Sequence, residues 1–274
     1  MEELAPAKIN LAIHVRERMP DGYHRIETIF AFAEDGDRLR VSASDELSLV
    51  SEGPFASSLG TENLVMTAAQ ALRERAGVRE GARLLLDKRL PIASGIGGGS
   101  ADAAAALRLL SRWWGLETPE LLEEIAAGLG ADVPACLAGR MARGEGRGDQ
   151  LVSQDGEGLS GTPSLLVNPG VQLSTAAVFA AWDGIDQGPL PIASPLAAAL
   201  EGRNDLEASA RLLVPEIGRL LAMLERAPGV LLSRMSGSGA TCFALFDTEE
   251  HRDAASSEIA ACKPNWWQLK TRLA

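Results

Sequence analysis

Apolar and polar residues alternate along the first segment of the chain, which is the pattern of a half-buried β-strand. Between residues 5 and 16, the apolar residues at positions 9, 11, 13 and 15 would share one face of the strand. Lys8, Asn10 and His14 would lie on the opposite face. The pattern therefore places a lysine and an asparagine side by side on one strand.

The next segments are also predicted to be extended. A turn at residues 20–22, where Asp-Gly follows a proline, leads into an extended run at 24–32. Asp-Gly-Asp at 35–37 predicts another turn, followed by strands at 38–44 and 47–51. The opening of the chain is thus predicted to be mostly β.

Helical spacing of apolar residues begins later. Residues 61–75 are predicted to form a helix that starts with a Thr61 cap. A strand at 82–90 and a glycine-rich loop precede an alanine-rich helix at 103–114, and Thr118-Pro119 begins a helix at 119–127. The second half reads as a split β-α-β layer with added helices, so the fold class is α+β. Its strands are expected at 164–167, 230–235, 241–246 and 266–272, and its helices near 175–182, 194–200, 205–212, 215–226 and 248–261.

Length and composition suggest two domains. At 274 residues and 46% apolar, the chain can build two lobes. The glycine- and charge-rich run at 144–149, with the polar stretch up to Pro163, is the candidate boundary. We expect one domain at residues 1–152 and another at 153–274. The run itself would serve as a solvated linker or would contact a ligand.

Charge and cysteine content narrow the class of protein. The formal net charge is −11, which disfavours nucleic acids and anionic membranes as partners. The three cysteines, Cys136, Cys242 and Cys262, are widely spaced and read as buried or reduced thiols. The N-terminus lacks the pattern of a secretory signal, and no apolar stretch approaches the ~20 residues that span a bilayer. We expect a soluble, cytoplasmic protein whose partner is a small molecule.

The loop at residues 90–102 carries four glycines and two serines between a predicted strand and a predicted helix. Gly97, Gly98 and Gly99 would let an anion approach the main chain at the positive end of the helix dipole, and Ser100 would cap the helix. The pattern is neither a Walker loop nor a complete dinucleotide fingerprint. A turn that only packs a helix on a sheet is the alternative.

Three segments together, at residues 6–11, 91–102 and 233–240, resemble the three motifs of the galactokinase, homoserine kinase, mevalonate kinase and phosphomevalonate kinase (GHMP) superfamily. Residues 21–24, 87–91 and 130–134 are similar to the 4-diphosphocytidyl-2-C-methyl-D-erythritol kinase family within it. The resemblance implies a two-domain GHMP kinase fold. Its N-terminal, ATP-binding domain would be like the second domain of ribosomal protein S5, and its C-terminal domain would be ferredoxin-like.

The resemblance also implies a reaction, in which the γ-phosphoryl group of ATP passes to the C2 hydroxyl of the methylerythritol unit. Lys8 would bind the transferring phosphate or lower the pKa of that hydroxyl, and Asp132 would accept its proton. Each residue also has a structural interpretation. Lys8 would be an ordinary solvated strand lysine, and Asp132 a helix N-cap before Val133-Pro134.

The remaining site residues follow from the same resemblance. Tyr23 would stack on the cytosine, His24 would bond its edge, and Phe179 would form the opposite wall or belong to the core. Asn63 would lie near the adenine or cap its helix, and the motif at 236–239 would be a second phosphate nest or only a turn. The substrate-binding set is Asn10, Tyr23, His24, Phe179, Gly237, Ser238 and Gly239. The ATP-binding set is Pro91, Ile92, Ala93, Ser94, Gly95, Ile96, Gly97, Gly98, Gly99, Ser100, Ala101 and Asn63.

Cofactors and rival functions complete the prediction. Mg²⁺ is expected on the ATP phosphates, with no protein ligand identified. Ser94 and Ile96 stand where the family usually has alanine or glycine and leucine, which are small departures. The rivals are a kinase for another small alcohol and a non-catalytic nucleotide-binding regulator. A monomer and a homodimer both remain open.

Overall fold

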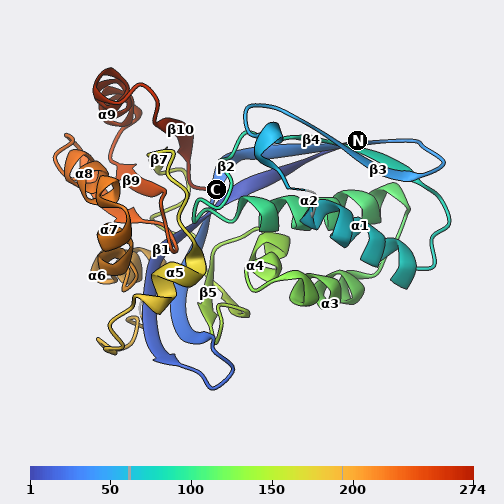
Figure 1. Ribbon diagram of the computed structural model, residues 1–274, viewed down its shortest axis with the longest axis horizontal. Coiled ribbons are helices and arrows are strands. Elements are labelled where there is room, and N and C mark those ends of the chain that lie inside the picture. The colour runs from blue at the N-terminus through green and yellow to red at the C-terminus, as the bar shows by residue number, and fades with distance from the viewer. Residues whose placement is uncertain (61–62, 193) are drawn as a thin grey trace. The chain divides into compact units, whose positions relative to one another are not determined.

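The computed structural model describes residues 1–60, 63–192 and 194–274, and its chain forms two compact units (Figure 1). Unit 1 consists of Met1–Ala7, Asp35–Ile92 and Gly97–Gly139. Unit 2 consists of Lys8–Glu34, Ala93–Ile96 and Arg140–Ala274. The long strands β1 (Glu2–Arg18) and β2 (His24–Ser42) each contribute to both units. The domain division between residues 152 and 153 stays a prediction.

Unit 1 combines a small sheet with helices that pack against one another. The second half of β2 pairs with β4 (Ala82–Asp87) in antiparallel fashion, and β4 pairs in parallel with β3 (Leu47–Glu52). Most of α2 is buried, and its run of alanines lets neighbouring helices approach closely. The helices are α1 (Leu64–Arg75), α2 (Gly98–Trp113), α3 (Pro119–Leu129) and α4 (Val133–Ala138), with a short η1 (Ala56–Ser58) before them.

Unit 2 contains the first half of β2, which pairs with β5 (Ala142–Glu145), and β5 pairs with β6 (Gln150–Ser153). Its second sheet is antiparallel, in the order β10-β7-β9-β8. These strands are β7 (Pro163–Asn168), β8 (Val230–Met235), β9 (Cys242–Phe246) and β10 (Trp267–Arg272). The helices are α5 (Thr175–Ala180), α6 (Pro195–Glu201), α7 (Glu207–Leu213), α8 (Pro215–Leu224) and α9 (Glu249–Cys262).

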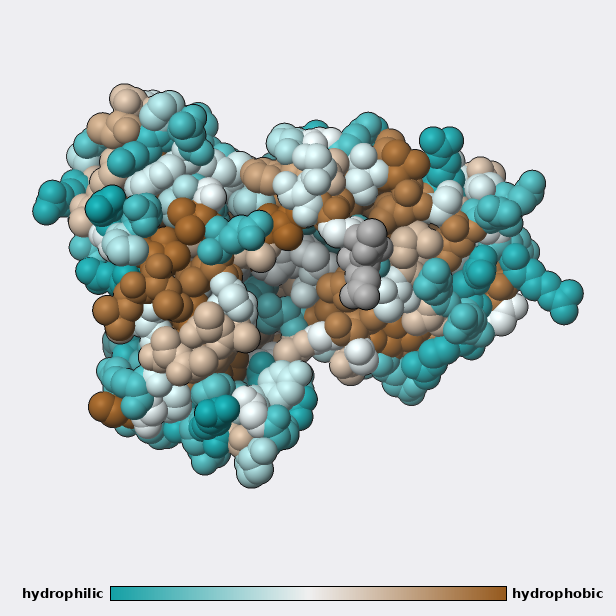
Figure 2. Space-filling model, in the orientation of Figure 1, coloured by the Kyte–Doolittle hydropathy of each residue, from teal (hydrophilic) through white to brown (hydrophobic). Residues whose placement is uncertain are grey.

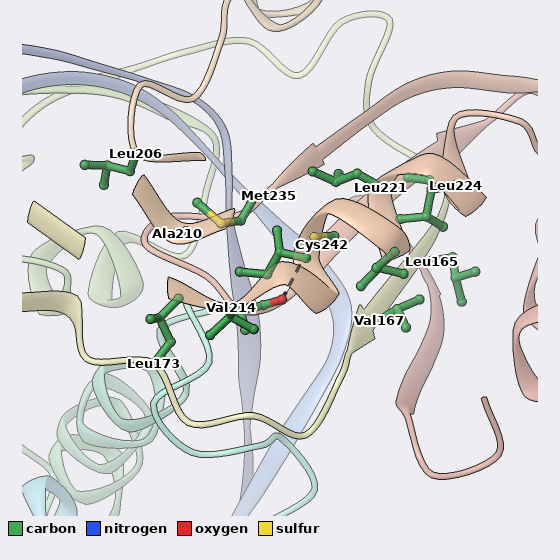
Figure 3. Packing of buried hydrophobic residues seen from close by; sticks show 14 of the residues in the cluster. Leu165, Val167, Leu173, Leu206, Ala210, Val214, Leu221, Leu224, Met235 and Cys242 are labelled. Carbon is green, nitrogen blue, oxygen red and sulfur yellow. Dashed lines mark hydrogen bonds between the residues drawn. The ribbon is translucent and has the colours of Figure 1, made fainter. Parts of the chain in front are cut away.

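The core of unit 2 lies on one face of this sheet (Figure 3). Alternate residues of β9, namely Cys242, Ala244 and Phe246, belong to the same apolar cluster as residues of α7, α8 and α9. One face of the strand thus meets apolar residues spaced at helical intervals on the helices, and Phe243 and Leu245 on the other face are buried as well. Complete burial raises the pKa of the Cys242 thiol well above its usual value, so this cysteine behaves as an apolar core residue.

Hydrophobic surface remains on part of unit 2. Leu200 on α6 and Leu212 and Leu213 on α7 are exposed, and Figure 2 shows hydrophobic residues gathered in that region. In the part of the chain that the structure describes, no helix has the length and apolar character needed to cross a membrane.

The predicted turn at residues 35–37 is wrong, because β2 runs through it without interruption. Gly36 is required there by packing, since a Cβ on this residue would lie 2.0 Å from the carbonyl oxygen of Ala5. Asp37 is fully buried instead of exposed in a turn. A glycine between two aspartates therefore marks a close approach of β1, not a change of chain direction.

One other local prediction also fails. The run at 144–149 ends β5 and forms the turn to β6, so it is part of a hairpin and not a solvated linker. Helix α1 begins at Leu64, and the Asn63 side chain accepts a hydrogen bond from the Val65 N–H at 2.9 Å. The expected Thr61 cap falls outside the described residues, whereas the capping interpretation of Asn63 is confirmed.

Candidate functional site

The glycine-rich loop leads into the N-terminus of α2, which belongs to unit 1. Gly97 is the N-cap, with a φ of 63° that favours glycine. The N–H groups of Gly98, Gly99 and Ser100 lie in the first turn, where a helix offers no carbonyl partner, at the positive end of its dipole. Ser100 is therefore not the cap, contrary to the prediction. Its hydroxyl lies in the first helical turn, among the amides that suit an anion.

The preceding residues, 93–96, belong to unit 2, where they form hydrogen bonds with the first strand and with the segment that follows the third motif. The carbonyl of Ile96 accepts from the Lys8 N–H at 3.0 Å, and that of Ser94 accepts from the Thr241 N–H at 3.1 Å. The loop thus joins the first strand and the third motif through main-chain bonds.

Gly95 is the residue that permits this arrangement. Its φ is 80°, and a Cβ would lie 2.4 Å from the Ser236 carbonyl oxygen and 2.7 Å from that of Gly239. The glycine is therefore needed for contact between two segments of the protein itself.

Lys8 and Asn10 form the polar centre of unit 2. Both are buried, and Lys8 Nζ donates to Asn10 Oδ1 at 2.8 Å. The ammonium also lies 5.3 Å from the centroid of the Phe30 ring, within range of a cation–π attraction. The solvated-lysine interpretation of Lys8 is excluded by its burial. Period-two alternation correctly placed both polar side chains on one face of the strand.

Asp132 lies in unit 1, directly before α4. It is half-buried, and its side chain makes no capping hydrogen bond to the helix. Asp132 therefore occupies the N-cap position, as the structural interpretation has it, without the side-chain hydrogen bond that usually stabilises a helix start. Its catalytic role, together with that of Lys8, stays a prediction.

A second buried lysine lies beneath the start of α2. Lys88 Nζ donates to Asp37 Oδ2 at 2.5 Å and to Asp102 Oδ2 at 2.6 Å, and all three side chains are buried. A Cβ on Gly98 would come 3.1 Å from the ammonium, so the lysine reaches the first residue of the helix. Sequence reasoning assigned no role to this cluster. The sequence did contain one sign of the cluster, because Asp102 is an acidic residue on the otherwise mostly apolar, buried face of α2.

The charges of this cluster are unbalanced, with two carboxylates for one ammonium. Burial alone would lower the pKa of Lys88, but the two carboxylates more than offset it, and the pKa lies above its usual value. Burial raises the pKa of Asp102 to about 7, although Lys88 opposes the shift and Asp37 adds to it. Among the described residues, Asp102 Oδ1 is buried without a hydrogen-bond partner. With both carboxylates ionised, the three side chains carry a net charge of −1, and one further proton makes them neutral. This imbalance favours bound protons, in line with the raised pKa values of Lys88 and Asp102.

Two of the predicted base-binding residues meet in unit 2. The rings of His24 and Phe179 lie 4.9 Å apart, and Trp182 packs edge-on against His24 at 5.6 Å. Burial, with a smaller contribution from Arg18, lowers the pKa of His24, so its ring is neutral near pH 7. Trp182 was missed by the sequence analysis, although it lies one helical turn after Phe179.

Tyr23 makes a contact of another kind. Its side chain is exposed, and the Arg147 guanidinium lies 4.1 Å from the ring centroid. Arg147 also pairs with Asp21 at 2.5 Å. One face of the Tyr23 ring is therefore covered by a cation. Arg147 belongs to the run at 144–149, so this run contacts one of the residues predicted to bind the cytosine.

The third motif is tightly held. Gly237 has a φ of 56°, and a Cβ there would lie 3.0 Å from the Gly95 carbonyl oxygen. The Ser238 hydroxyl lies 2.9 Å from that of Thr175, and Asn204 Nδ2 donates to the carbonyl of Gly237 at 2.8 Å. The motif is more than a turn between strands, because side chains from two other segments fix its shape.

Arg234 anchors the strand that leads into this motif. Its guanidinium is buried and donates to the carbonyls of Leu11, Ala199 and Gly202. Burial lowers the pKa of Arg234 to about 10, and the group stays charged at neutral pH. The arginine therefore ties β8 to β1, the strand that carries Lys8.

Comparisons with known proteins agree with this arrangement. Residues 63–140 match the family model described as GHMP kinases N terminal domain, and residues 193–265 match the one described as GHMP kinases C terminal. The chain is 56% identical over 277 residues to 4-diphosphocytidyl-2-C-methyl-D-erythritol kinase of Rhizorhabdus wittichii, covering 99% of the chain and 94% of the relative. The enzyme of the same name from Novosphingobium aromaticivorans is 49% identical, with 98% and 91% covered.

Solved structures give the same result. A crystal structure of 4-(cytidine 5'-diphospho)-2C-methyl-D-erythritol kinase matches with a TM-score of 0.84 and 37% identity, covering 99% of each chain. Homoserine kinase from Cytophaga hutchinsonii matches with a TM-score of 0.71 at 18% identity, covering 100% of this chain and 95% of that one, a likeness of fold alone. The predicted α+β, two-domain GHMP kinase fold is confirmed.

Proposed function

The chain belongs to the 4-diphosphocytidyl-2-C-methyl-D-erythritol kinase family of the GHMP kinases, and from this we propose that it phosphorylates the C2 hydroxyl of 4-diphosphocytidyl-2-C-methyl-D-erythritol with ATP. The products are the 2-phosphate and ADP, in the non-mevalonate route to isoprenoid precursors. The observation that carries the proposal is 56% identity to a kinase of that name over 99% of the chain.

Lys8 is proposed to stabilise the negative charge of the phosphoryl group in flight. Phosphoryl transfer has a loose transition state, so most of the rate comes from placement of the reactants and from neutralisation of charge. A buried ammonium is suited to this work, because the surrounding medium screens its field less than water does. Asn10 Oδ1, which accepts from the ammonium, fixes the direction in which Lys8 points.

Asp132 is proposed to accept the proton of the C2 hydroxyl. A carboxylate serves as general base when it reaches that proton directly. The short α4 begins one residue later, with Pro134 in its first turn, so the backbone that carries Asp132 is fixed. An acceptor held by such a backbone would lose little entropy on reaching the transition state.

ATP is proposed to bind with its phosphates at the N-terminus of α2. The amides from Gly98 to Ser100 point along the helix axis, and Gly99 is exposed there without a side chain to block an anion. Mg²⁺ is proposed to arrive on the triphosphate, where it would neutralise part of the phosphate charge.

The cytosine is proposed to lie against Phe179 and Tyr23, with His24 bonding its edge. Neutral imidazole has one N–H donor and one nitrogen acceptor, which matches the mixed donor and acceptor edge of a nucleobase. Residues 237–239 are proposed to contribute to the binding of the same substrate.

An ADP-release assay tests the proposed function. We expect turnover with 4-diphosphocytidyl-2-C-methylerythritol, and none with methylerythritol phosphate, homoserine or mevalonate. Equal turnover of methylerythritol phosphate would rule out the base pocket, and turnover of homoserine or mevalonate alone would assign the chain to another kinase.

Variants then test the two catalytic residues. Asp132→Asn and Lys8→Met should each lower kcat at least about 100-fold while ATP still binds. The matched control is Asp155→Asn, at an exposed loop position, which should turn over like the wild type. An unchanged rate in either site variant would remove that residue from the mechanism.

A further inference from the structure

Thr28 on β2 makes two hydrogen bonds whose directions can be worked out. It is fully buried, and its Oγ1 lies 2.7 Å from the Ala12 carbonyl oxygen and 2.8 Å from Asn10 Nδ2. A threonine hydroxyl has one hydrogen, and a carbonyl oxygen can only accept. The Thr28 hydroxyl therefore donates to Ala12 and accepts from the Asn10 amide.

This direction determines which way the Asn10 side chain is turned. With Nδ2 committed to Thr28, the amide oxygen Oδ1 faces the Lys8 ammonium at 2.8 Å. The flipped amide would set N–H donors against the ammonium and would offer its oxygen to a hydroxyl with no second hydrogen. The Lys8 ammonium on one side and the Thr28 hydroxyl on the other therefore both require the same orientation of the Asn10 amide. Hydrogen-bond networks are the usual basis for assigning the oxygen and nitrogen of such an amide.

The main chain of Asn10 is fixed in the same manner. Its N–H donates to Ser236 Oγ at 3.1 Å, and that hydroxyl donates to the Gly95 carbonyl at 3.0 Å. Ser236 therefore holds the backbone of Asn10, and Thr28 holds its side chain. The chain of donors runs in one sense from Lys8 through Asn10 and Thr28 to Ala12.

We propose that Thr28 is a positioning residue of the kinase, which orients the Asn10 amide and through it holds the Lys8 ammonium in place. The proposal rests on the function proposed above for Lys8. Without the Thr28 hydroxyl, Asn10 loses the acceptor that keeps its Nδ2 away from the lysine. The ammonium then loses a fixed partner, and its direction becomes variable.

Thr28 also has an ordinary packing role, and the test must separate the two. It pairs with Gly144 on β5, and a Cβ on that glycine would lie 3.1 Å from the Thr28 methyl group. Thr28→Val keeps a branched side chain of similar shape but has no hydroxyl. Thr28→Ser keeps the hydroxyl but lacks the methyl group.

Steady-state kinetics of the full-length protein provide the first measurement. We expect Thr28→Val to lower kcat about 10- to 100-fold, the effect of losing one or two hydrogen bonds that position a reacting group, with little change in KM for the cytidine substrate. Thr28→Ser should recover most of the rate. The control is Thr271→Val, which removes another buried threonine hydroxyl, on β10, and should keep the wild-type rate.

A double-mutant cycle shows whether Thr28 acts through its neighbour. In an Asn10→Ala background, Thr28→Val should cause little further loss, because the group that it positions is already gone. Losses that multiply, equal impairment of the Val and Ser variants, or a Val variant as active as the wild type would overturn the proposal.

A measurement independent of turnover distinguishes this inference from the proposed function. The side-chain amide protons of Asn10, followed by NMR, should exchange with solvent faster in Thr28→Val than in Thr28→Ser. Unchanged exchange would refute the positioning role. A wild-type protein that releases no ADP with the cytidine substrate would refute the proposed function instead.

Discussion

Replacing Lys88 with methionine should lower the free energy of unfolding by about 3–5 kcal/mol, the usual cost of removing one partner from a buried ion pair. The ammonium lies 2.5 Å from Asp37 Oδ2 and 2.6 Å from Asp102 Oδ2. At an effective dielectric constant of about 20 and these separations, each attraction is worth about 6–7 kcal/mol before the cost of desolvating the charges is subtracted. Part of the loss is offset, because methionine fills a similar volume and has no charge to desolvate.

The size of this loss should depend on pH. The pKa of Asp102, about 7 with the ammonium present, should rise further in Lys88→Met. A carboxyl whose pKa is higher in the folded than in the unfolded state contributes stability that is present at low pH and lost as the pH rises. The variant should therefore fall further below the wild type near pH 8 than near pH 5.

Denaturant titrations at both pH values measure the effect. The control is Lys270→Met, which removes an exposed ammonium 3.5 Å from Asp253 and should cost less than about 1 kcal/mol. The reasoning is refuted if Lys88→Met loses no more stability than Lys270→Met, or if its loss is the same at both pH values.

Three further predictions concern Asp102, Gly95 and His14. Because the pKa of Asp102 is about 7 in the folded protein and its ordinary value is 3.8, wild-type stability should fall by up to about 1.4 kcal/mol per pH unit between these values, and unfolding titrations of Asp102→Asn should show a flatter profile. Gly95→Ala should destabilise the protein by about 1–3 kcal/mol and lower ADP release, since its Cβ would meet the Ser236 carbonyl oxygen at 2.4 Å. Burial, and then Arg203, lower the pKa of His14, so the free energy of unfolding should fall as the pH drops below 6.5. An NMR titration should show the His14 ring taking up its proton at a lower pH than a free histidine does.

Much of the fold could be predicted from the pattern of apolar residues. In the second half, all four strands and five helices occur within a few residues of their expected ranges among the described residues. The reason is that α8 buries one apolar face spaced at helical intervals, whereas β9 is a short run of apolar residues. The failures share a cause. At Gly36 and at the run 144–149, glycine signals that normally indicate turns or linkers reflect close packing and a hairpin, which depend on distant segments.

The candidate site shows the same division. Lys8 and Asn10 were placed correctly because a strand alternates its faces, and the contact of His24 with Phe179 agrees with the family motifs. Thr28 was missed because a threonine in a strand is ordinary, and its role depends on a partner on the neighbouring strand. Asp37 was missed because its buried carboxylate pairs with Lys88, far along the chain.

The path of the chain between the units affects how the protein can be assembled. Unit 1 is complete by Gly139, but unit 2 needs Lys8–Glu34 as well as everything after that point. Ile13 and Val15, which are synthesised long before Leu220 and Ile259, pack in the same core as these residues. Contacts between such distant residues slow folding, because the entropy of closing a long loop is lost before the contacts can stabilise the structure. A ribosome-bound intermediate would therefore contain a folded unit 1, while the β-hairpin at residues 8–34 would have no core to pack in until residues 140–274 are made.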